Sequence, residues 1–238
     1  MVESGGLQRE AGTAGRIDGV RVALDAMGGD RGAEANIEGA VLAARELGAS
    51  VILVGIEEKL RDHLRQYEVQ GLRLDLRHAP EVVEMGESPS AAVRRKKQSS
   101  IRIGMDLVRQ GEAEAFVSAG NTGAVMATAV LTLGLLPGVE RPAIAVVVPT
   151  LTGRAVLLDA GANVDCKPRH LTQFAVMGNV YARDVLGLAR PRVGLLSIGE
   201  EESKGNELTK EVFKALEDEV SLNFIGNVEG HDVFNGNS

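Results

Sequence analysis

The stretch Leu157–Leu171, LLDAGANVDCKPRHL, constrains the fold more than any other part of this chain. It opens with apolar residues typical of a buried strand end. A polar loop follows, and then Pro168, a favoured first residue of a helix. In α/β folds ligands bind beyond the carboxyl ends of the strands, and a helix N-terminus there offers free N–H groups to an anion. Lys167 adds a positive charge at the same point, so the stretch predicts half of an anion site.

Short apolar runs alternate with amphipathic segments along the rest of the chain, which predicts an α/β fold with a mainly parallel sheet. The 29 glycines and the 3% aromatic content fit many tight turns and aliphatic packing. Ala143–Val148 and Ala155–Leu158 flank Leu151-Thr152-Gly153 and predict one antiparallel hairpin. The other predicted strands are Val20–Ala26, Val51–Gly55, Leu72–Ala79, Ala115–Ala119, Val193–Ile198 and Leu222–Val228.

The domain prediction is a flexible tail over residues 1–18 and a single α/β domain over residues 19–238. The tail lacks the apolar core of a signal peptide. The polar residues after the last predicted strand lead us to expect no closing helix and a C-terminally incomplete domain. The most apolar run, Ala124–Leu136, is shorter than the roughly 18 residues of a membrane span. With one cysteine, Cys166, a reducing compartment fits, and we expect a cytoplasmic protein.

A net charge of −7 argues against general nucleic-acid binding, which usually needs a basic field. The basic run Arg94–Lys97 stands out against this background. It is either a solvated helix face or a surface that recruits phosphate or an acidic partner.

Four polar, glycine-containing loops follow predicted strands, and the convergence of their positions is the main functional signal. Any one such turn is structural more often than not. Because all four follow strand ends, we expect them to meet at one edge of the sheet. The loops are Asp25–Asp30, Ser118–Gly123, Asp159–Lys167 and Gly199–Asn206.

Several familiar active-site motifs do not occur. The chain has no G-x-G-x-x-G at its first helix, no G-x-x-x-x-G-K-[ST] and no G-x-S-x-G. The four histidines show no metal-ligand spacing, so we predict no metal and no cofactor. Cys166 beside Lys167 is either a loop residue or a nucleophile, and no histidine lies with it in a recognisable Cys/His signature. His170 lies close enough to the predicted anion site to be a candidate contact.

Six segments, in order, resemble the phosphate acyltransferase (PlsX) family. They are ALDAMGGD (Ala23–Asp30), AVRRKKQSS (Ala92–Ser100), SAGNTGA (Ser118–Ala124), LDAGANVDCKPRHL (Leu158–Leu171), GEEESKGNEL (Gly199–Leu208) and NFIGNVEGHD (Asn223–Asp232). The resemblance implies a three-layer α/β/α fold related to isocitrate and isopropylmalate dehydrogenases and to phosphotransacetylase. The chain departs from the family pattern at Arg31-Gly32-Ala33 and at Cys166, and family members continue past its C-terminus.

The implied reaction forms acyl-phosphate from an acyl group on acyl carrier protein and inorganic phosphate, in fatty acid and phospholipid synthesis. Phosphate is itself the nucleophile, so the protein supplies positioning and charge stabilisation. The implied partners are acyl carrier protein, inorganic phosphate and a second copy in a homodimer. Peripheral membrane association, or contact with a membrane glycerol-phosphate acyltransferase, is also implied.

The site residues follow from this resemblance. The expected phosphate-binding residues are Asp25, Gly28, Gly29, Gly120, Asn121, Thr122, Gly123 and Asn163. The expected catalytic residues are Lys167, Lys204, Asn206 and Asp165, and the expected carrier-protein docking residues are Arg94, Arg95, Lys96 and Lys97. Lys167 would stabilise phosphate or the oxyanion, with Asp25 and Asp165 orienting it.

Three other functions remain possible interpretations of the sequence. The chain could be a phosphotransacetylase-like enzyme that takes acyl-CoA, because both reactions share phosphate and a pantetheine arm. It could be a non-catalytic scaffold that links fatty acid synthesis to the membrane. A dehydrogenase is supported by fold ancestry alone and disfavoured by the missing nucleotide motif.

Overall fold

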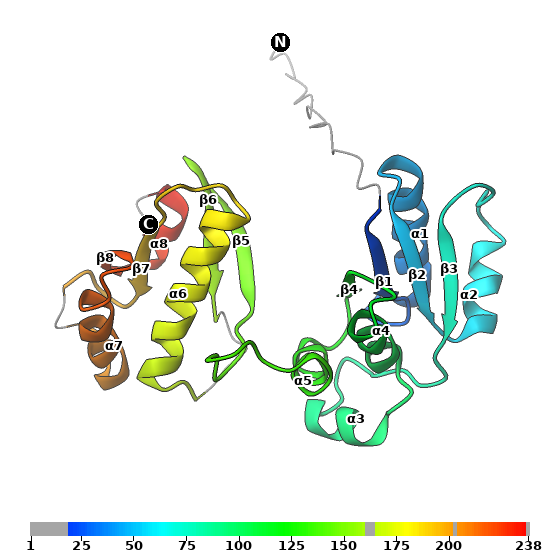
Figure 1. The fold of residues 1–238 in the computed structure, drawn as a ribbon, viewed down its shortest axis with the longest axis horizontal. Coiled ribbons are helices and arrows are strands. Elements are labelled where there is room, and N and C mark those ends of the chain that lie inside the picture. The colour runs from blue at the N-terminus through cyan, green and yellow to red at the C-terminus, as the bar shows by residue number, and fades with distance from the viewer. Residues whose placement is uncertain (1–18, 160–164, 202–203, 237–238) are drawn as a thin grey trace, which may run out of the picture. The chain divides into compact units, whose positions relative to one another are not determined.

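The computed structural model describes residues 19–159, 165–201 and 204–236 (Figure 1). The chain separates into two compact units, of which the first ends at Gly134 and the second begins at Leu135. The predicted flexible tail lies outside the described residues. The single domain expected over residues 19–238 stays a prediction.

A parallel four-stranded sheet forms the centre of the first unit, in the order β3-β2-β1-β4. Figure 1 shows β1, β2 and β3 side by side. The strands are β1 (Arg21–Asp25), β2 (Ser50–Gly55), β3 (Leu74–His78) and β4 (Ala115–Ser118). Each lies within a predicted run, except that β2 begins one residue earlier than predicted.

Helices cover both faces of this sheet because the middle strand β2 is apolar on both sides. Val51 and Leu53 of β2 share a core with Ile37 of α1 and Leu60 of α2. Residues 52 and 54, on the opposite face, pack with Leu107 of α4. The first unit therefore has three layers, as expected for a doubly covered parallel sheet. Its helices are α1 (Gly32–Glu46), α2 (Glu57–Leu64), α3 (Pro89–Arg95), α4 (Ser100–Arg109) and α5 (Thr122–Leu133).

The strand order creates a topological switch point between β1 and β4. From β1 the chain builds outward through β2 and β3, and it then returns to place β4 on the other side of β1. Since both strands are parallel, the loops that follow them leave the same edge of the sheet. Ligands of open α/β sheets bind in the crevice at such a point.

The second unit contains two strand pairs among its described residues. The first pair is the predicted antiparallel hairpin, which is confirmed, and the second pair is parallel. Figure 1 shows α6 running along the hairpin, and α7 packs on β8 through the edge-to-face rings of Phe213 and Phe224. The elements are β5 (Ala145–Thr150), β6 (Gly153–Leu158), α6 (Pro168–Asp184), β7 (Arg192–Leu196), α7 (Glu207–Glu217), β8 (Asn223–Val228) and α8 (Gly230–Asn235).

The α/β class with a mostly parallel sheet is confirmed, but the expectation that no helix follows the last strand is wrong. Residues 230–235 form α8, because Asp232 accepts a hydrogen bond from the N–H of Glu229 (2.9 Å) and caps the first turn. The polar residues after β8 form a helix N-cap and not an irregular chain end. None of the helices in the described ranges has the length and apolar content to cross a membrane.

Candidate functional site

The loops after β1 and β4 are joined by the buried carboxylate of Asp25. This side chain is 1% exposed, and its Oδ1 accepts from the N–H of Met27 (3.2 Å). Its Oδ2 accepts from the hydroxyl of Ser118 (2.8 Å), whose oxygen in turn accepts from the N–H of Gly120 (3.0 Å). Asp25 therefore holds two loops of the first unit together.

The same two loops touch at Gly28. A Cβ added there would lie 2.6 Å from Oδ2 of Asp25 and 2.9 Å from the backbone of Gly120, closer than real Cβ contacts. Asn36 of α1 fixes the loop from the other side by donating to the carbonyl of Gly28 (2.7 Å). Gly29, the next predicted phosphate ligand, lies against the β4 loop as well. The structure thus brings Asp25, Gly28, Gly29 and Gly120 together.

Asn121 stands at the N-cap of α5, and its side chain is committed to the fold. Its Oδ1 accepts from the N–H of Ala124 (3.0 Å). Its Nδ2 faces three carbonyl oxygens of the preceding loop, those of Glu84 (3.3 Å), Met85 (3.0 Å) and Glu87 (2.9 Å). Both N–H groups of the side-chain amide therefore face carbonyl oxygens, and none is left to bind phosphate as predicted. A role for Asn121 in phosphate binding would rest on its backbone.

The first turn of α5 offers backbone donors at this edge. Thr122 and Gly123 are its first two residues, so their N–H groups have no acceptor within the helix. The side chain of Thr122 is exposed. The positive end of the helix dipole favours a negative group at this position.

In the second unit, Lys167 is the N-cap of α6, directly before Pro168. Its side chain is exposed and makes no ion pair with any residue in the described ranges. Its backbone N–H donates to Nδ1 of the buried His170 (3.1 Å). Asp165 is exposed, and its carbonyl accepts from Arg141 (2.7 Å). Asn163 lies outside the described residues.

Cys166 is not poised to act as a nucleophile. Its thiol donates to Oδ2 of Asp159 (3.2 Å). Burial, together with the nearby Asp159 carboxylate, raises the pKa of the Cys166 thiol to about 11. The thiol stays protonated near neutral pH, which removes the thiolate that such chemistry needs.

The loop after β7 carries the remaining catalytic candidates. Asn206 is the N-cap of α7, and its Oδ1 accepts from the N–H of Thr209 (2.9 Å). The side chain of Lys204 is exposed. The oxygen of Asn206 is therefore used by the helix, whereas the ammonium of Lys204 faces solvent.

The basic run divides into an anchored residue and three exposed ones. The ammonium of Lys96 donates to the carbonyl of Val82 (2.6 Å) and to Oε2 of Glu87 (2.5 Å). The hydrogen bond from Lys96 to the Glu87 carboxylate is the main reason that the pKa of Glu87 is lowered. Arg94, Arg95 and Lys97 are exposed. Sequence reasoning missed the anchoring role of Lys96, because its partners come from a loop about ten residues earlier.

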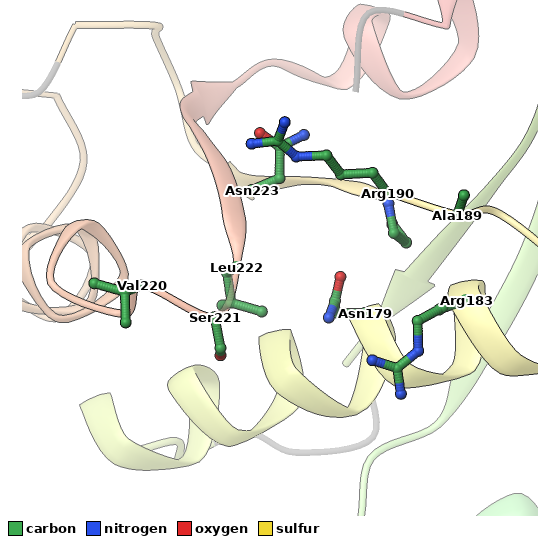
Figure 2. A pocket seen from close by; sticks show the side chains of 9 residues that line it. Asn179, Arg183, Ala189, Arg190, Val220, Ser221, Leu222 and Asn223 are labelled. Carbon is green, nitrogen blue, oxygen red and sulfur yellow. The ribbon is translucent and has the colours of Figure 1, made fainter.

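A cavity of about 170 Å³ lies at the other end of β7 and β8 from Lys204 and Asn206 (Figure 2). Figure 2 shows Asn179 and Arg183 reaching it from α6, with Arg190 on the segment before β7. It lies at the amino ends of these strands, so it is separate from the candidate residues that follow β7.

One group of side chains in the described ranges has the composition of a metal site. Single ligand atoms of Glu200, His231 and Asp232 lie within 4.8 Å of one another. Glu200 and His231 are exposed, and the carboxylate of Asp232 already accepts from Asn235 (3.1 Å) and caps α8. This cluster was not among the predicted site residues.

Residues 20–238 match the model of a family described as fatty acid synthesis protein, and the chain belongs to this family. It is similar to the phosphate acyltransferase of Geobacter sulfurreducens, at 58% identity over 217 residues that cover 91% of this chain and 62% of the relative. The phosphate acyltransferase of Citrifermentans bemidjiense is 57% identical over 217 residues, 91% of this chain and 61% of that protein. The chain thus spans about three fifths of the length of these curated relatives.

Solved structures with a similar fold include a phosphotransacetylase from Streptococcus pyogenes. Its TM-score is 0.61 at 18% identity, covering 90% of this chain and 69% of the other. A branched-chain phosphotransacylase from Enterococcus faecalis gives a TM-score of 0.59 at 15% identity, with the same coverage. At these identities the likeness concerns the fold alone.

Proposed function

We propose that this chain carries the acyltransferase chemistry that its relatives' name describes. It would form acyl-phosphate from inorganic phosphate and an acyl group on acyl carrier protein, in fatty acid and phospholipid synthesis. The observation that carries the proposal is 58% identity to a phosphate acyltransferase over 91% of the chain. The family description, a fatty acid synthesis protein, supports the same substrate class.

In the proposed reaction an oxygen of phosphate attacks the thioester carbonyl carbon. The carbonyl oxygen becomes an oxyanion that collapses as the C–S bond breaks, and the pantetheine sulfur leaves as a thiolate. The proton that hydrogen phosphate loses on acylation reaches this thiolate through water, so acyl-phosphate and a free thiol are formed. No enzyme nucleophile is needed, which agrees with the protonated thiol of Cys166. What the protein must provide is positioning of phosphate and stabilisation of negative charge.

For the first unit we assign phosphate binding to the start of α5. The donors are the N–H groups of Thr122 and Gly123, which the helix leaves without acceptors. Gly28, Gly29 and Gly120 keep the neighbouring loops in close contact beside this turn. Asp25 supports the loops as a buried acceptor, and contact with phosphate is not part of its proposed role.

For the second unit we assign charge stabilisation to Lys167. Its ammonium is exposed and lies at the positive end of α6. Lys204 is the second candidate, with Asn206 holding the start of the following helix. Asp165 stays a candidate for orienting Lys167.

Recognition of an acidic carrier protein is assigned to the exposed cations Arg94, Arg95 and Lys97. Lys96 is excluded from this role because its ammonium is used inside the loop. A homodimer, a peripheral membrane contact and a membrane glycerol-phosphate acyltransferase partner are retained as proposals from the resemblance.

An acyl-CoA donor is the second candidate, because CoA presents an acyl thioester on the same kind of pantetheine arm. The two donors differ only in what carries the pantetheine arm. Comparing acyl-carrier protein and acyl-CoA at equal concentration decides between them. Carrier-protein binding without phosphate-dependent turnover would instead support a scaffold.

The experiment for the whole proposal follows acyl-phosphate released by the purified chain, trapped with hydroxylamine, with and without inorganic phosphate. We expect phosphate-dependent product from the wild type. Lys167→Ala should lower the rate by about a hundredfold or more, the order found when a charge-stabilising donor is lost. Lys214→Ala, an exposed lysine in the last turn of α7, is the matched control and should stay within about twofold. A wild type without phosphate-dependent product refutes the activity, and an unchanged Lys167→Ala refutes the role of the charge.

A further inference from the structure

We propose that His170 is a positioning residue, which acts on the proposed reaction by holding the backbone of Lys167 in one conformation. The inference rests on the proposed function, because it assigns His170 a role through the charged residue of that site. Its physical basis is the hydrogen bond from the Lys167 N–H to Nδ1 of His170 (3.1 Å).

The hydrogen bond from Lys167 determines the tautomer of the His170 ring. It is buried, with 8% of the residue exposed. A ring nitrogen accepts a hydrogen bond only when it carries no proton, so the proton of the neutral ring is on Nε2. Nε2 faces Oε2 of Glu140 at 3.6 Å, and that oxygen also pairs with Nε of Arg169 (2.6 Å). A carboxylate on this side favours the tautomer that leaves Nδ1 free to accept.

This arrangement fixes Lys167 on both sides. Its N–H is held by the ring, and its carbonyl accepts from the N–H of His170 (2.9 Å). Pro168 follows directly and restricts the residue before it to extended backbone, where Lys167 lies (φ −97°, ψ 159°). The ammonium of Lys167 therefore starts from a fixed Cα, and its flexible stem is the only part left to adapt.

The same contacts exclude two other roles for His170. Nδ1 is used by the backbone, and Nε2 belongs to a buried ring and faces Glu140 at 3.6 Å, so neither nitrogen is placed to protonate a leaving thiolate. Its burial also keeps it from direct contact with a phosphate in solvent. What remains is an effect on the geometry of Lys167.

Two substitutions separate the hydrogen bond from the presence of a side chain. His170→Asn puts an amide oxygen close to the position of Nδ1 and can accept the Lys167 N–H. His170→Gln puts its amide where Nε2 lies and leaves that N–H without its acceptor. We expect His170→Asn to keep kcat/KM within about threefold of wild type and His170→Gln to lower it by about tenfold to a hundredfold, the range for a misplaced catalytic group. Equal activity of the two variants would overturn the proposal.

A double-mutant cycle shows whether His170 acts through Lys167. The loss caused by His170→Gln should disappear in a Lys167→Ala background, because there is no charge left to misplace. A merely structural role of His170 would cost the same factor in both backgrounds, and that outcome contradicts the proposal. Thermal unfolding of each variant checks that all four proteins are folded.

Readouts that need no turnover keep this test apart from that of the proposed function. Nitrogen NMR of the His170 ring should show the Nε2–H tautomer, and the Lys167 amide should exchange slowly in wild type and His170→Asn but faster in His170→Gln. If the wild type makes no acyl-phosphate, the proposed function fails while these signals still decide the hydrogen bond. If the Lys167 amide exchanges equally fast in all three proteins, the positioning role of His170 is refuted.

Discussion

Asn121 provides the sharpest test of how the candidate edge is built, because its side chain is used for folding. Its Oδ1 caps α5 through the N–H of Ala124, and its Nδ2 meets the carbonyls of Glu84, Met85 and Glu87. Loss of an N-cap costs about 1 kcal/mol. Two N–H groups bonded to carbonyls add about 1 kcal/mol each. Asn121→Ala should therefore lower the free energy of unfolding of the first unit by about 3 kcal/mol.

Asn121→Asp separates the two halves of this interaction. The carboxylate keeps the cap to Ala124 but removes both donors and sets a negative charge against the loop carbonyls. We expect a loss of about 2 kcal/mol or more from the missing donors. Thr122→Ala, at the adjacent exposed side chain, is the control and should stay within about 0.5 kcal/mol.

Urea unfolding followed by circular dichroism, with amide exchange of α5 peptides to identify the unit, measures these differences. At a slope of about 1.5 kcal/mol per molar urea, 3 kcal/mol moves the midpoint by about 2 M. If Asn121→Ala unfolds at the wild-type midpoint with the wild-type slope, the side chain is free for another role and our reasoning about it is refuted.

Three further predictions concern a close contact, a thiol and a surface charge. Gly28→Ala should destabilise the first unit by about 1–3 kcal/mol in urea unfolding, because the added Cβ would lie 2.6 Å from Oδ2 of Asp25. The control Gly39→Ala, at an open position of α1, should stabilise the unit by about 0.5–1 kcal/mol. Equal effects of the two substitutions would contradict the close contact at Gly28. Because the pKa of Cys166 is raised to about 11 from 9.0, iodoacetamide at pH 8 should alkylate it about a hundredfold more slowly in the folded than in the unfolded chain, and Asp159→Asn should speed the reaction. The folded chain holds this proton to higher pH than the unfolded chain, so the thiol's contribution to stability is complete below pH 9 and is lost as the pH rises through about 11. Arg94→Glu should raise the KM for acyl carrier protein with kcat unchanged, most strongly at low salt, and a salt-independent KM would argue against docking there.

The elements of this fold could be predicted wherever a local pattern decides the structure. The turn Leu151-Thr152-Gly153 between two apolar runs predicted the hairpin, and Pro168 marked the start of α6 within one residue. The short α8 was missed because six polar-leaning residues carry no periodicity, and its cap depends on one carboxylate, Asp232.

Of the four loops predicted to meet at one edge, the two that follow β1 and β4 do meet, whereas β6 and β7 belong to other sheets and the convergence of their loops with this edge stays a prediction. The side-chain roles could not be predicted. Strand ends and glycines place Gly28 and Gly120 at one edge without knowledge of any partner. The hydrogen bonds of Asn121 and Lys96 could not be predicted from sequence, because Asn121 donates to main-chain carbonyls of an earlier loop and Lys96 donates to one such carbonyl as well as to the Glu87 carboxylate. Carbonyls belong to every residue, so sequence carries no sign of which ones a side chain will meet.

The contact between Gly28 and Gly120 has a consequence for variation in this protein. With no room for a side chain between them, and with Asp25 bridging the same loops, a change on one side alters the space available to the other. In a survey of all pairwise substitutions, a change in one loop should therefore be tolerated mainly when it is combined with a compensating change in the other loop. The two segments, which lie more than ninety residues apart in sequence, are then expected to vary together.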